Sequence, residues 1–457
     1  MSSSLEITQV EGRRGTSRFV DAAWSVHDQP VSSGWIPPLR ALVRDGLDQG
    51  GNPFYQQAER ALFIAQRNGR VVGRVAAIEN RSHNDHHEDR VGFFGFFDCR
   101  DDQEAANGLF DRAEEWLGGR GMTSARGPVS PSMNHECGVL VDGFDHPPVI
   151  MTPWNPTYYD SLIGRAGYAP ARDLLGYYLP ADDQFAVPDR VRRLAERTLE
   201  RSHLVFRAWD LADLKETARD AFDLYCDAWG GNWGFVPPSW EEFWHLAKDL
   251  KSVLHPDFAF IAELEGKTVG FIMIARDMNR VLRQIPSGRL WPWNIARLLL
   301  GLPKVLSGRI VLLGLRPEYR NRGFFPLFAF EVARRAEKIG AEGAEASWIL
   351  EDNESLVAPL EAMNLEPYKR WRIYEQSLAM IPGSCFRASF IRPGRTRTFP
   401  PGSSMLSAVG RMFTPTGSTA SGRTRTWPHS FGSGRPNSSP CMRAIPRPFS
   451  ESTPPGM

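Results

Sequence analysis

The chain has 457 residues and a formal net charge of only +1 at pH 7, and this length predicts two or three domains rather than one. The charge is unevenly spread: residues 379–457 contain ten arginines and one acid, which leaves 44 basic and 52 acidic residues before them and argues against nucleic acid as the main partner. The five cysteines are scattered without a C-x-x-C pair, so neither a disulfide framework nor a zinc site is indicated, and no metal is expected. The N-terminus has no hydrophobic leader core and no window reaches the length of a membrane span, so a cytoplasmic protein is the default expectation.

The first half of the chain has an alternating strand and helix pattern. Two strand-like runs within Ala61–Ile78 meet at Asn68-Gly69, a dipeptide that favours a tight hairpin turn. A strand, a helix and another strand are then predicted for Val91–Phe97, Gln103–Leu117 and Ser124–Val129.

The polar run SHNDHHEDR, which starts at Ser82, separates two of these strands. A polar run between strands is typical of a solvated loop. The alternative is a metal site formed by His83, His86 and His87.

An internal repeat organises the chain. FIAQRNGRVVG begins at Phe63 and FIAELEGKTVG begins at Phe260, and the same offset of 197 residues aligns Tyr177 with Tyr374. Two matches with one shared offset predict two copies of a single unit. The alternative is two unrelated α/β domains that share a hairpin pattern. We therefore expect a mixed-sheet α/β (α+β) fold with tandem domains at 1–182 and 183–378.

The most informative stretch runs from Arg309 to Ile339. It reads as a buried strand (Ile310–Leu315), a turn, and a helix whose apolar residues recur at helical spacing. Free backbone N–H groups, the positive end of a helix dipole and guanidinium groups together suit a pyrophosphate. The segment between strand and helix offers all three, in the order Arg320-Asn321-Arg322-Gly323. The alternative is an ordinary solvated basic turn.

The first copy differs at the same place. Residues Phe97–Asp102 contain three acids and no glycine. Carboxylates would repel a pyrophosphate, so the first copy is predicted to have lost coenzyme binding.

An insertion in the second copy, Gly288–Leu306, is rich in Leu and Trp with basic residues interspersed. It is too short and too broken by prolines to span a bilayer. One interpretation is an interfacial segment or a cover over a lipid chain, with Trp291 as a substrate contact. The other is a helix packed between the two halves.

The first copy has its own insertion, the polar, glycine-rich loop Gly127–Pro148. Long loops of this kind often carry function. Asn134, His135 and Glu136 give the loop acid–base capacity, and we predict substrate contacts by Asn134 and Glu136. Trp233, in a similar segment of the second copy, is a further substrate candidate.

The pattern P-x-x-R-x-x-G before an apolar helix resembles the coenzyme A loop of the GCN5-related N-acetyltransferase (GNAT) superfamily. The resemblance implies two tandem GNAT-type domains, the first one degenerate, and acyl-CoA or acetyl-CoA as co-substrate. The residues that it assigns to coenzyme binding are Leu315, Pro317, Arg320, Asn321, Arg322, Gly323, Phe324 and Phe325. Phe325 stands where the superfamily has a second small residue.

Direct acyl transfer to an amine needs a base for the ammonium proton and a proton donor for the leaving thiolate. Glu351 is predicted to be the base and Asn353 to contact the coenzyme arm or a bound water. The alternative for Glu351 is a solvated acid at a strand end. In many superfamily members a tyrosine seven residues after this asparagine protonates the thiolate, and here that position is Leu360.

Residues 5–378 as a whole resemble the large tandem-domain acyltransferases of bacteria that include ceramide synthase-like proteins. The stretches that carry the resemblance are NHECGVLVDGFD, NPTYYDSLIGRAGY, NWGFVPPS, WILEDN and RIYE. They imply an acyl-CoA-dependent N-acyltransferase with a sphingoid-type lipid amine as a candidate acceptor. From the composition of the insertion 288–306 we also expect its peripheral contact with the inner face of the membrane. An acetyltransferase for a small amine or a protein, and a non-catalytic acyl-CoA-binding scaffold, stay open as alternatives.

Residues 379–457 are rich in Pro, Gly, Ser and Arg and have no apolar period, so we predict a disordered tail. The abrupt change of composition suggests a frame-shifted extension. A basic tail that docks anionic lipid is the functional alternative.

Overall fold

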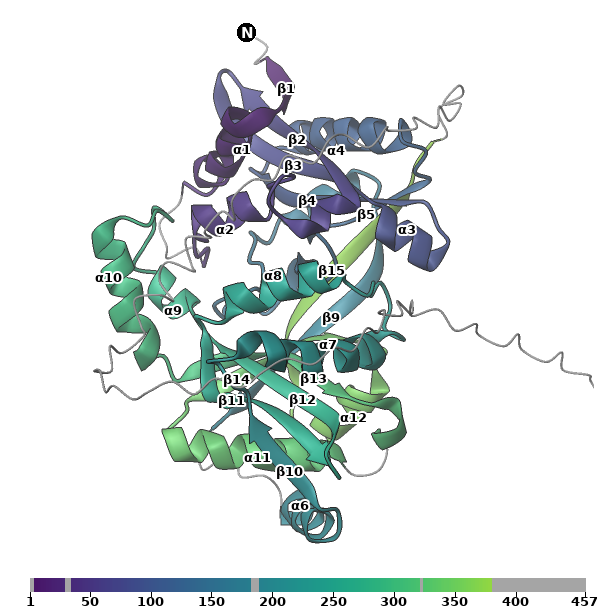
Figure 1. Ribbon diagram of the computed structural model, residues 1–457. Coiled ribbons are helices and arrows are strands. Elements are labelled where there is room, and N and C mark those ends of the chain that lie inside the picture. Colours follow the sequence, from purple (N-terminus) through teal and green to yellow (C-terminus); the bar gives the residue numbers. More distant parts are fainter. Residues whose placement is uncertain (1–3, 29–33, 182–188, 321–323, 380–457) are drawn as a thin grey trace, which may run out of the picture. The chain divides into compact units, whose positions relative to one another are not determined.

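The computed structural model describes residues 4–28, 34–181, 189–320 and 324–379 (Figure 1). The predicted tail lies outside the described residues from position 380 on, as do Asn321, Arg322 and Gly323 of the predicted coenzyme loop. Within the described part, a 13-stranded mixed sheet and a separate two-stranded ribbon are flanked by helices. The predicted mixed α/β fold class is confirmed.

The first half supplies the sheet strands β1 (Leu5–Val10), β2 (Ala58–Arg67), β3 (Arg70–Asn80), β4 (Val91–Cys99), β5 (Ser124–Gly127), β8 (Val139–Asp142) and β9 (Ala169–Pro180). The ribbon consists of β6 (Val129–Ser130) and β7 (Glu136–Cys137). The helices of this half are α1 (Gly12–Val26), α2 (Arg40–Asp45), α3 (Arg81–His87), α4 (Gln103–Gly118) and α5 (Tyr159–Arg165).

The second half supplies the strands β10 (Leu204–Ala208), β11 (Leu254–Leu264), β12 (Lys267–Arg276), β13 (Ser307–Leu315), β14 (Gly343–Leu350) and β15 (Pro367–Ser377). Its helices are α6 (Asp189–Arg201), α7 (Leu214–Trp229), α8 (Trp240–Leu250), α9 (Asn279–Leu282), α10 (Pro292–Gly301), α11 (Phe324–Ile339) and α12 (Glu354–Glu361).

The predicted repeat appears as two similar hairpins. Asn68 and Gly69 turn from β2 into β3 with φ of 50° and 76°, and Glu265 and Gly266 turn from β11 into β12 with φ of 51° and 76°. Two consecutive positive φ values are those of a type I′ turn, whose twist matches that of the flanking strands. Nothing lies within 4 Å of a Cβ added at either glycine, so the backbone conformation rather than crowding requires glycine there.

Helices cover both faces of the sheet in each half (Figure 1). In the first half α4 packs on one face around Phe110, and α1 packs on the other around Phe19. In the second half α7 and α8 pack on one face, and α11 packs on the other through Leu327 and Phe328. The predicted helix behind the basic turn is thus confirmed as α11, and it ends before Gly340, which has a φ of 67°.

The final strands of the two halves are exchanged within the sheet. The strand order is β1-β2-β3-β4-β5-β15-β9-β14-β13-β12-β11-β10. β9 of the first half therefore pairs with β14 of the second, while β15 of the second half pairs with β5 of the first. The predicted domain boundary between residues 182 and 183 lies outside the described residues and stays a prediction.

The segment after β3 differs from its prediction. The polar run that starts at Ser82 is largely the helix α3, because Asn80 caps it by accepting a hydrogen bond from the His83 backbone N–H at 3.2 Å. His83 is only 1% exposed and packs edge-on against Phe93. The prediction of a solvated loop is wrong for this segment, because one histidine faces the core.

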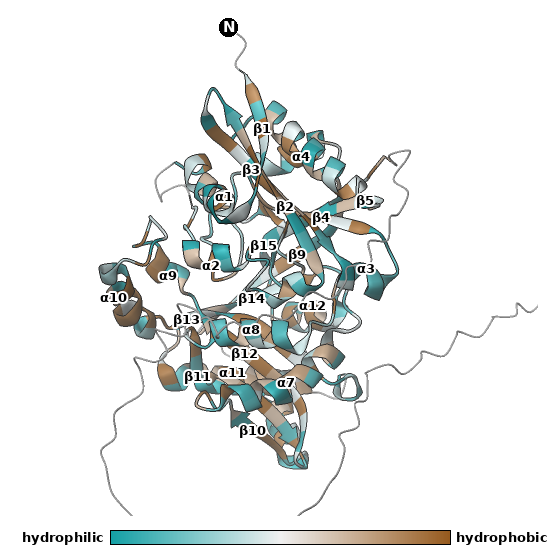
Figure 2. Ribbon diagram, turned by 45° about the horizontal axis from the view of Figure 1, so that its top comes forward, coloured by the Kyte–Doolittle hydropathy of each residue, from teal (hydrophilic) through white to brown (hydrophobic). Residues whose placement is uncertain are grey.

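Figure 2 colours the ribbon by hydropathy, and much of α10 has the colour of hydrophobic residues. Among the helices that the structure describes, none has both the length and the apolar character needed to cross a membrane.

Candidate active site

Two neighbouring parallel strands of the second half diverge. β13 and β14 are paired over four residues, up to Ile310 and Ala346, although β13 continues to Leu315 and β14 to Leu350. Beyond the last pair, backbone N–H and C=O groups on the facing edges have no partner in the neighbouring strand. Such edges can bind an extended ligand.

A cavity of about 1120 Å³ opens at this divergence. Its wall includes β13, β14, α11 and α12, together with residues 133–135, Cys137 of β7 and the loop 232–235. Apolar side chains dominate it, among them Ile310, Leu312, Phe324, Phe328, Leu356 and Met363. Its polar members include Asn134, His135, Arg309, Ser347 and Asn353. A mostly apolar wall with a few polar groups is typical of a cofactor or small-molecule site.

Most of the predicted coenzyme-loop residues whose side chains are described lie at this cavity. Leu315, Arg320 and Phe324 line it, and Pro317 begins a short 3-10 helix that ends at Tyr319. The Arg320 guanidinium donates to the carbonyl oxygens of Ala228 at 2.5 Å and Leu315 at 3.3 Å. Among the described residues, no carboxylate forms an ion pair with it, so its charge is available to an anionic ligand.

Asn321, Arg322 and Gly323 lie outside the described residues, and Phe325 is described only as part of the α11 backbone. The predicted coenzyme contacts of the whole loop therefore stay predictions.

The first half fills the corresponding place with its own atoms. β4 and β5 also pair briefly, at Val91–Phe93, but a Cβ added at Gly95 would lie 1.4 Å from the Val129 carbonyl oxygen. The chain that follows β5 thus packs directly against β4. At the end of β4 the Cys99 backbone N–H donates to the Tyr159 hydroxyl at 2.9 Å.

The N-terminus of α4 is likewise occupied by a group of the protein. The Asp102 carboxylate accepts a hydrogen bond from the Ala105 backbone N–H at 3.1 Å and forms an ion pair with Arg67 at 2.8 Å. This carboxylate takes the position at which a helix N-terminus would bind an anion. The first half therefore has the same arrangement of strands and helix, but its own atoms fill the position at which the second half has a cavity.

The two predicted catalytic residues are separated by the cavity wall. Asn353 lines the cavity and begins α12 as its N-cap. Glu351 is not among the residues lining the cavity: its side chain is 43% exposed and lies 3.3 Å from Arg370 Nη1. The roles of both residues stay predictions.

The four predicted substrate contacts lie in different surroundings. Asn134 lines the cavity and donates to the Val236 carbonyl at 3.0 Å, and Trp233 lines it beneath the Arg126 guanidinium, 4.9 Å from the ring centre. Glu136 is exposed, and partial loss of its contact with water raises the pKa of its carboxyl. Trp291 lies outside the cavity wall and is 48% exposed.

No protein-family model matches the chain. The bacterial ceramide synthase of Caulobacter vibrioides is 35% identical to it over 351 residues, which cover 75% of this chain and 90% of that protein. The YghO protein of Escherichia coli is 32% identical over 359 residues, 76% of this chain and 90% of that protein. The chain belongs to the bacterial ceramide synthase family.

Membership of the bacterial ceramide synthase family confirms the predicted resemblance and the prediction of an acyltransferase. Among solved structures, a tandem GNAT protein from the clavulanic acid biosynthesis pathway is similar at a TM-score of 0.48 and 13% identity, over 82% of this chain and 99% of that one.

His135, named in the sequence only for the acid–base capacity of its loop and not among the predicted contacts, also lies at the cavity. Its Nδ1 lies 2.8 Å from Ser132 Oγ. Burial, reinforced by the nearby His245, lowers the pKa of His135 to about 4. The imidazole is therefore uncharged at neutral pH and can accept a proton. The sequence signal was present, because His135 stands between the two predicted contacts Asn134 and Glu136.

Arg309 is a second missed residue. It is 3% exposed, and its guanidinium donates to Ser347 Oγ at 2.9 Å and to the Met151 carbonyl at 3.0 Å while lying over the Trp348 ring at 4.4 Å. Burial lowers its pKa. The signal in the sequence was a single charged residue, Arg309, directly before the apolar run Ile310–Leu315.

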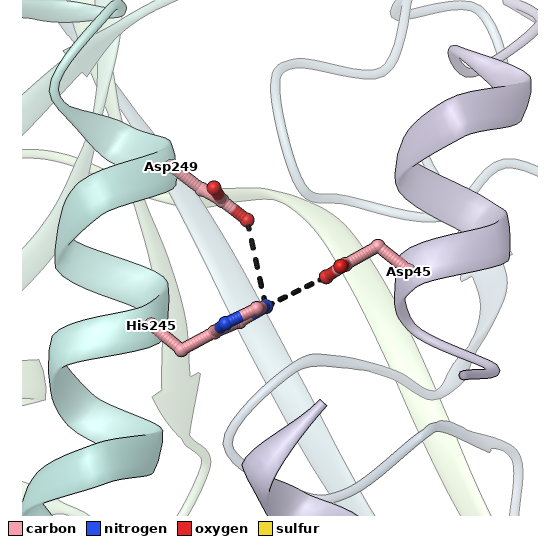
Figure 3. A group of neighbouring side chains, drawn as sticks. All are labelled: Asp45, His245 and Asp249. Carbon is pink, nitrogen blue, oxygen red and sulfur yellow. Dashed lines mark hydrogen bonds and ion pairs between the residues drawn. The ribbon is translucent and has the colours of Figure 1, made fainter. Parts of the chain in front are cut away.

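One imidazole and two carboxylates, from His245, Asp45 and Asp249, lie beside each other (Figure 3). His245 and Asp249 come from α8 and Asp45 from α2, with His245 Nε2 at 2.7 Å from Asp45 and 4.0 Å from Asp249. The hydrogen bond that His245 donates to the Asp45 carboxylate raises the pKa of His245. These groups could together ligate a cation, but the 2.7 Å contact is that of an ordinary ion pair, which joins the two halves. We interpret it as a structural contact.

Proposed function

We propose that the chain is an acyl-CoA-dependent N-acyltransferase that moves a long acyl chain from the coenzyme thioester to the amine of a sphingoid-type lipid. The coenzyme is proposed to lie between the diverging strands, with its phosphates near Arg320 and the start of α11. The proposed acyl site is the apolar part of the cavity.

The observation that carries this proposal is the size and character of that cavity. Sites for drug-sized ligands measure roughly 300–1,000 Å³, and this one measures about 1120 Å³ with mainly apolar walls. The coenzyme would take part of this space, and an acetyl group would leave the apolar remainder unfilled. None of the described lining residues lies between 288 and 306, so the proposed acyl site does not depend on that insertion.

The proposed acceptor follows from the relatives rather than from the cavity alone. A curated relative at 35% identity is a ceramide synthase, and 90% of that protein is matched. A sphingoid-type amine is a membrane lipid. This makes the apolar insertion at 288–306 a candidate for membrane contact.

The proposed transfer is direct. The amine nitrogen bonds to the thioester carbon, the C–S bond breaks, the ammonium proton passes to a base, and the coenzyme thiolate takes up a proton. Cys137 lines the cavity, but burial raises the pKa of its thiol to about 12. An acyl-cysteine intermediate would need a thiolate, which is scarce at neutral pH under these conditions.

His135 is the proton acceptor that the geometry favours over Glu351. It faces the cavity, whereas Glu351 lies outside the wall beside Arg370. Among the described residues no hydrogen bond reaches its Nε2, so that nitrogen can meet a substrate amine. Asn134 and Asn353, on the same wall, are proposed to orient the acceptor and the coenzyme arm.

Calorimetric titration with acetyl-CoA and palmitoyl-CoA tests the proposal. Each buried methylene contributes about 0.8 kcal/mol, so burial of only three of them corresponds to about 2.4 kcal/mol, or about 50-fold tighter binding of palmitoyl-CoA. Ala333→Trp, which adds bulk to the cavity wall on α11, should remove this preference. Lys338→Trp, the same bulky residue at an exposed position of α11, is the control and should keep it.

Equal affinity for both thioesters would overturn the long-chain donor and favour an acetyltransferase. Binding of neither would overturn the acyl-CoA enzyme. Once palmitoyl-CoA binds, product formation with a sphingoid base, compared with a short-chain amine, tests the acceptor. Transfer to the short-chain amine alone would overturn the lipid acceptor.

A further inference from the structure

Large apolar side chains are exposed around α10. Trp291, Trp293 and Leu300 are 48%, 60% and 70% exposed, and the two indole rings stack with their centroids 5.8 Å apart. In Figure 2 much of the α10 ribbon has the hydrophobic colour. An exposed apolar group of this kind, with two tryptophans within three residues, marks an interaction surface.

The opposite face of this segment is firmly held. Leu290 and Leu298 pack against a buried cluster that includes Leu39 of the first half and Ile285. Asn294 is 3% exposed and donates to the Arg289 carbonyl at 2.8 Å, so the segment is anchored in the protein. The exposed tryptophans therefore stand on a rigid support.

Basic residues surround the exposed face. From residue 278 to residue 317 the chain contains no Asp or Glu. Arg283, Arg289, Arg297 and Lys304 are exposed, and none of them forms an ion pair with a carboxylate of the described residues. Exposed tryptophans and leucines ringed by uncompensated cations are complementary to a membrane surface with anionic lipids.

We propose that α10 docks on an anionic membrane leaflet, with Trp291, Trp293 and Leu300 inserted among the acyl chains and the four cations at the level of the lipid phosphates. The helix lies in the interface and does not cross it, because it comprises only ten residues. The purpose of this contact, delivery of a lipid acceptor, rests on the proposed function, whereas the contact itself rests on the surface of α10.

The docking face is close to the cavity along the chain. α10 is followed by a 3-10 turn, Leu302–Lys304, and then by β13, which forms part of the cavity wall. Leu302 is 9% exposed and packs against Ile150 and Val253. A membrane-bound α10 would therefore hold the start of β13 near the bilayer surface.

Co-sedimentation with extruded vesicles tests this proposal on the full chain. Wild type should bind vesicles that contain phosphatidylglycerol and bind pure phosphatidylcholine vesicles far more weakly. The triple variant Trp291→Ser, Trp293→Ser, Leu300→Ser should lose at least tenfold in affinity. The matched control, Leu194→Ser with Val205→Ser, removes two exposed apolar side chains elsewhere in the second half and should bind as wild type does.

A second variant, Arg289→Gln, Arg297→Gln, Lys304→Gln, isolates the charges. Each charge near an anionic surface is worth about fivefold in affinity, so this variant should bind roughly a hundredfold more weakly at low salt. All variants keep the arginine-rich residues after 379, so their differences report on α10 alone. Quenching of tryptophan fluorescence by brominated acyl chains should be weaker in the variant that lacks Trp291 and Trp293.

Equal vesicle binding by wild type and the triple variant would overturn the proposal. Wild type that ignores anionic vesicles but dimerises through this face, as judged by light scattering, would overturn it in favour of a second copy of the chain. Palmitoyl-CoA binding without vesicles should be unchanged in the triple variant. If the chain binds vesicles but no thioester, the proposed function is contradicted while the proposed membrane docking of α10 is supported.

Discussion

At the scale of single residues, the ionisation of His135 decides what the cavity can do chemically. Burial holds its pKa near 4, so the imidazole is unprotonated from about pH 5 upward. A general base contributes about 10²- to 10⁴-fold to a rate. We therefore predict that His135→Gln lowers the single-turnover rate of acyl transfer by at least 100-fold, while thioester affinity changes little.

The pH profile of that rate follows from the same shift. The required form is the deprotonated one, so the ionisation of His135 leaves the rate flat between pH 6 and 8 and lowers it as pH falls through about 4. Glu351→Gln is the matched comparison, because Glu351 is the base predicted from the sequence. Retention of the rate in His135→Gln together with its loss in Glu351→Gln would make Glu351 the base.

At the scale of elements, a buried ion pair joins β14 to β15. Lys369 Nζ lies 2.9 Å from Glu345, and the side chains are 1% and 0% exposed. Glu345 also accepts hydrogen bonds from Ser347 and Tyr368, and Ser347 in turn receives one from Arg309. The cavity arginine is thus positioned by a network of buried groups that spans three strands.

Removal of one member of this pair leaves a charge without its partner. We predict that Lys369→Met lowers the free energy of unfolding by about 3–5 kcal/mol, measured by urea denaturation. The double variant Lys369→Met, Glu345→Leu should recover part of this loss, because no buried charge is then left alone. Strictly additive losses in the double variant would show that the two side chains are not coupled.

The elements that could be predicted from the sequence are those with local signals. The two hairpins follow from their turn residues, and α11 follows from its apolar period and its end at Gly340. The prediction of a solvated loop from Ser82 was wrong. The polar composition of this segment does not reveal that Asn80 caps a helix or that His83 contacts the core. The cavity itself depends on where β13 and β14 separate, which is a non-local property.

At the scale of the whole molecule, the exchange of final strands makes the two halves depend on each other. Trp371, Ile373 and Tyr374 of β15 belong to the cores of the first half, although β15 is the last strand of the second. Nothing in the local pattern of this strand could have predicted its partner. Repetition in the sequence predicted two similar units, whereas the pairing that unites them requires contacts between residues far apart in the chain.

Trp371 offers the sharpest test of this dependence. It lies on β15, is fully buried, packs in the cluster around Phe19 and donates from Nε1 to the Pro153 carbonyl at 3.1 Å. We predict that Trp371→Ala lowers the free energy of unfolding by about 3–5 kcal/mol. β15 also pairs with β9, which pairs with β14, so the loss of stability should extend to the strands of both halves.

Hydrogen exchange measured by mass spectrometry distinguishes a loss of stability in both halves from a loss confined to the first half. In Trp371→Ala, peptides from β2–β3 and from β11–β12 should both exchange faster by the same factor, since one cooperative unit opens as a whole. Tyr178→Ala, which truncates a 40% exposed aromatic residue on β9, is the control and should leave both regions protected. Faster exchange confined to β2–β3 would mean that the halves open independently despite the exchanged strands, and thermal unfolding of the variant would then proceed in two steps.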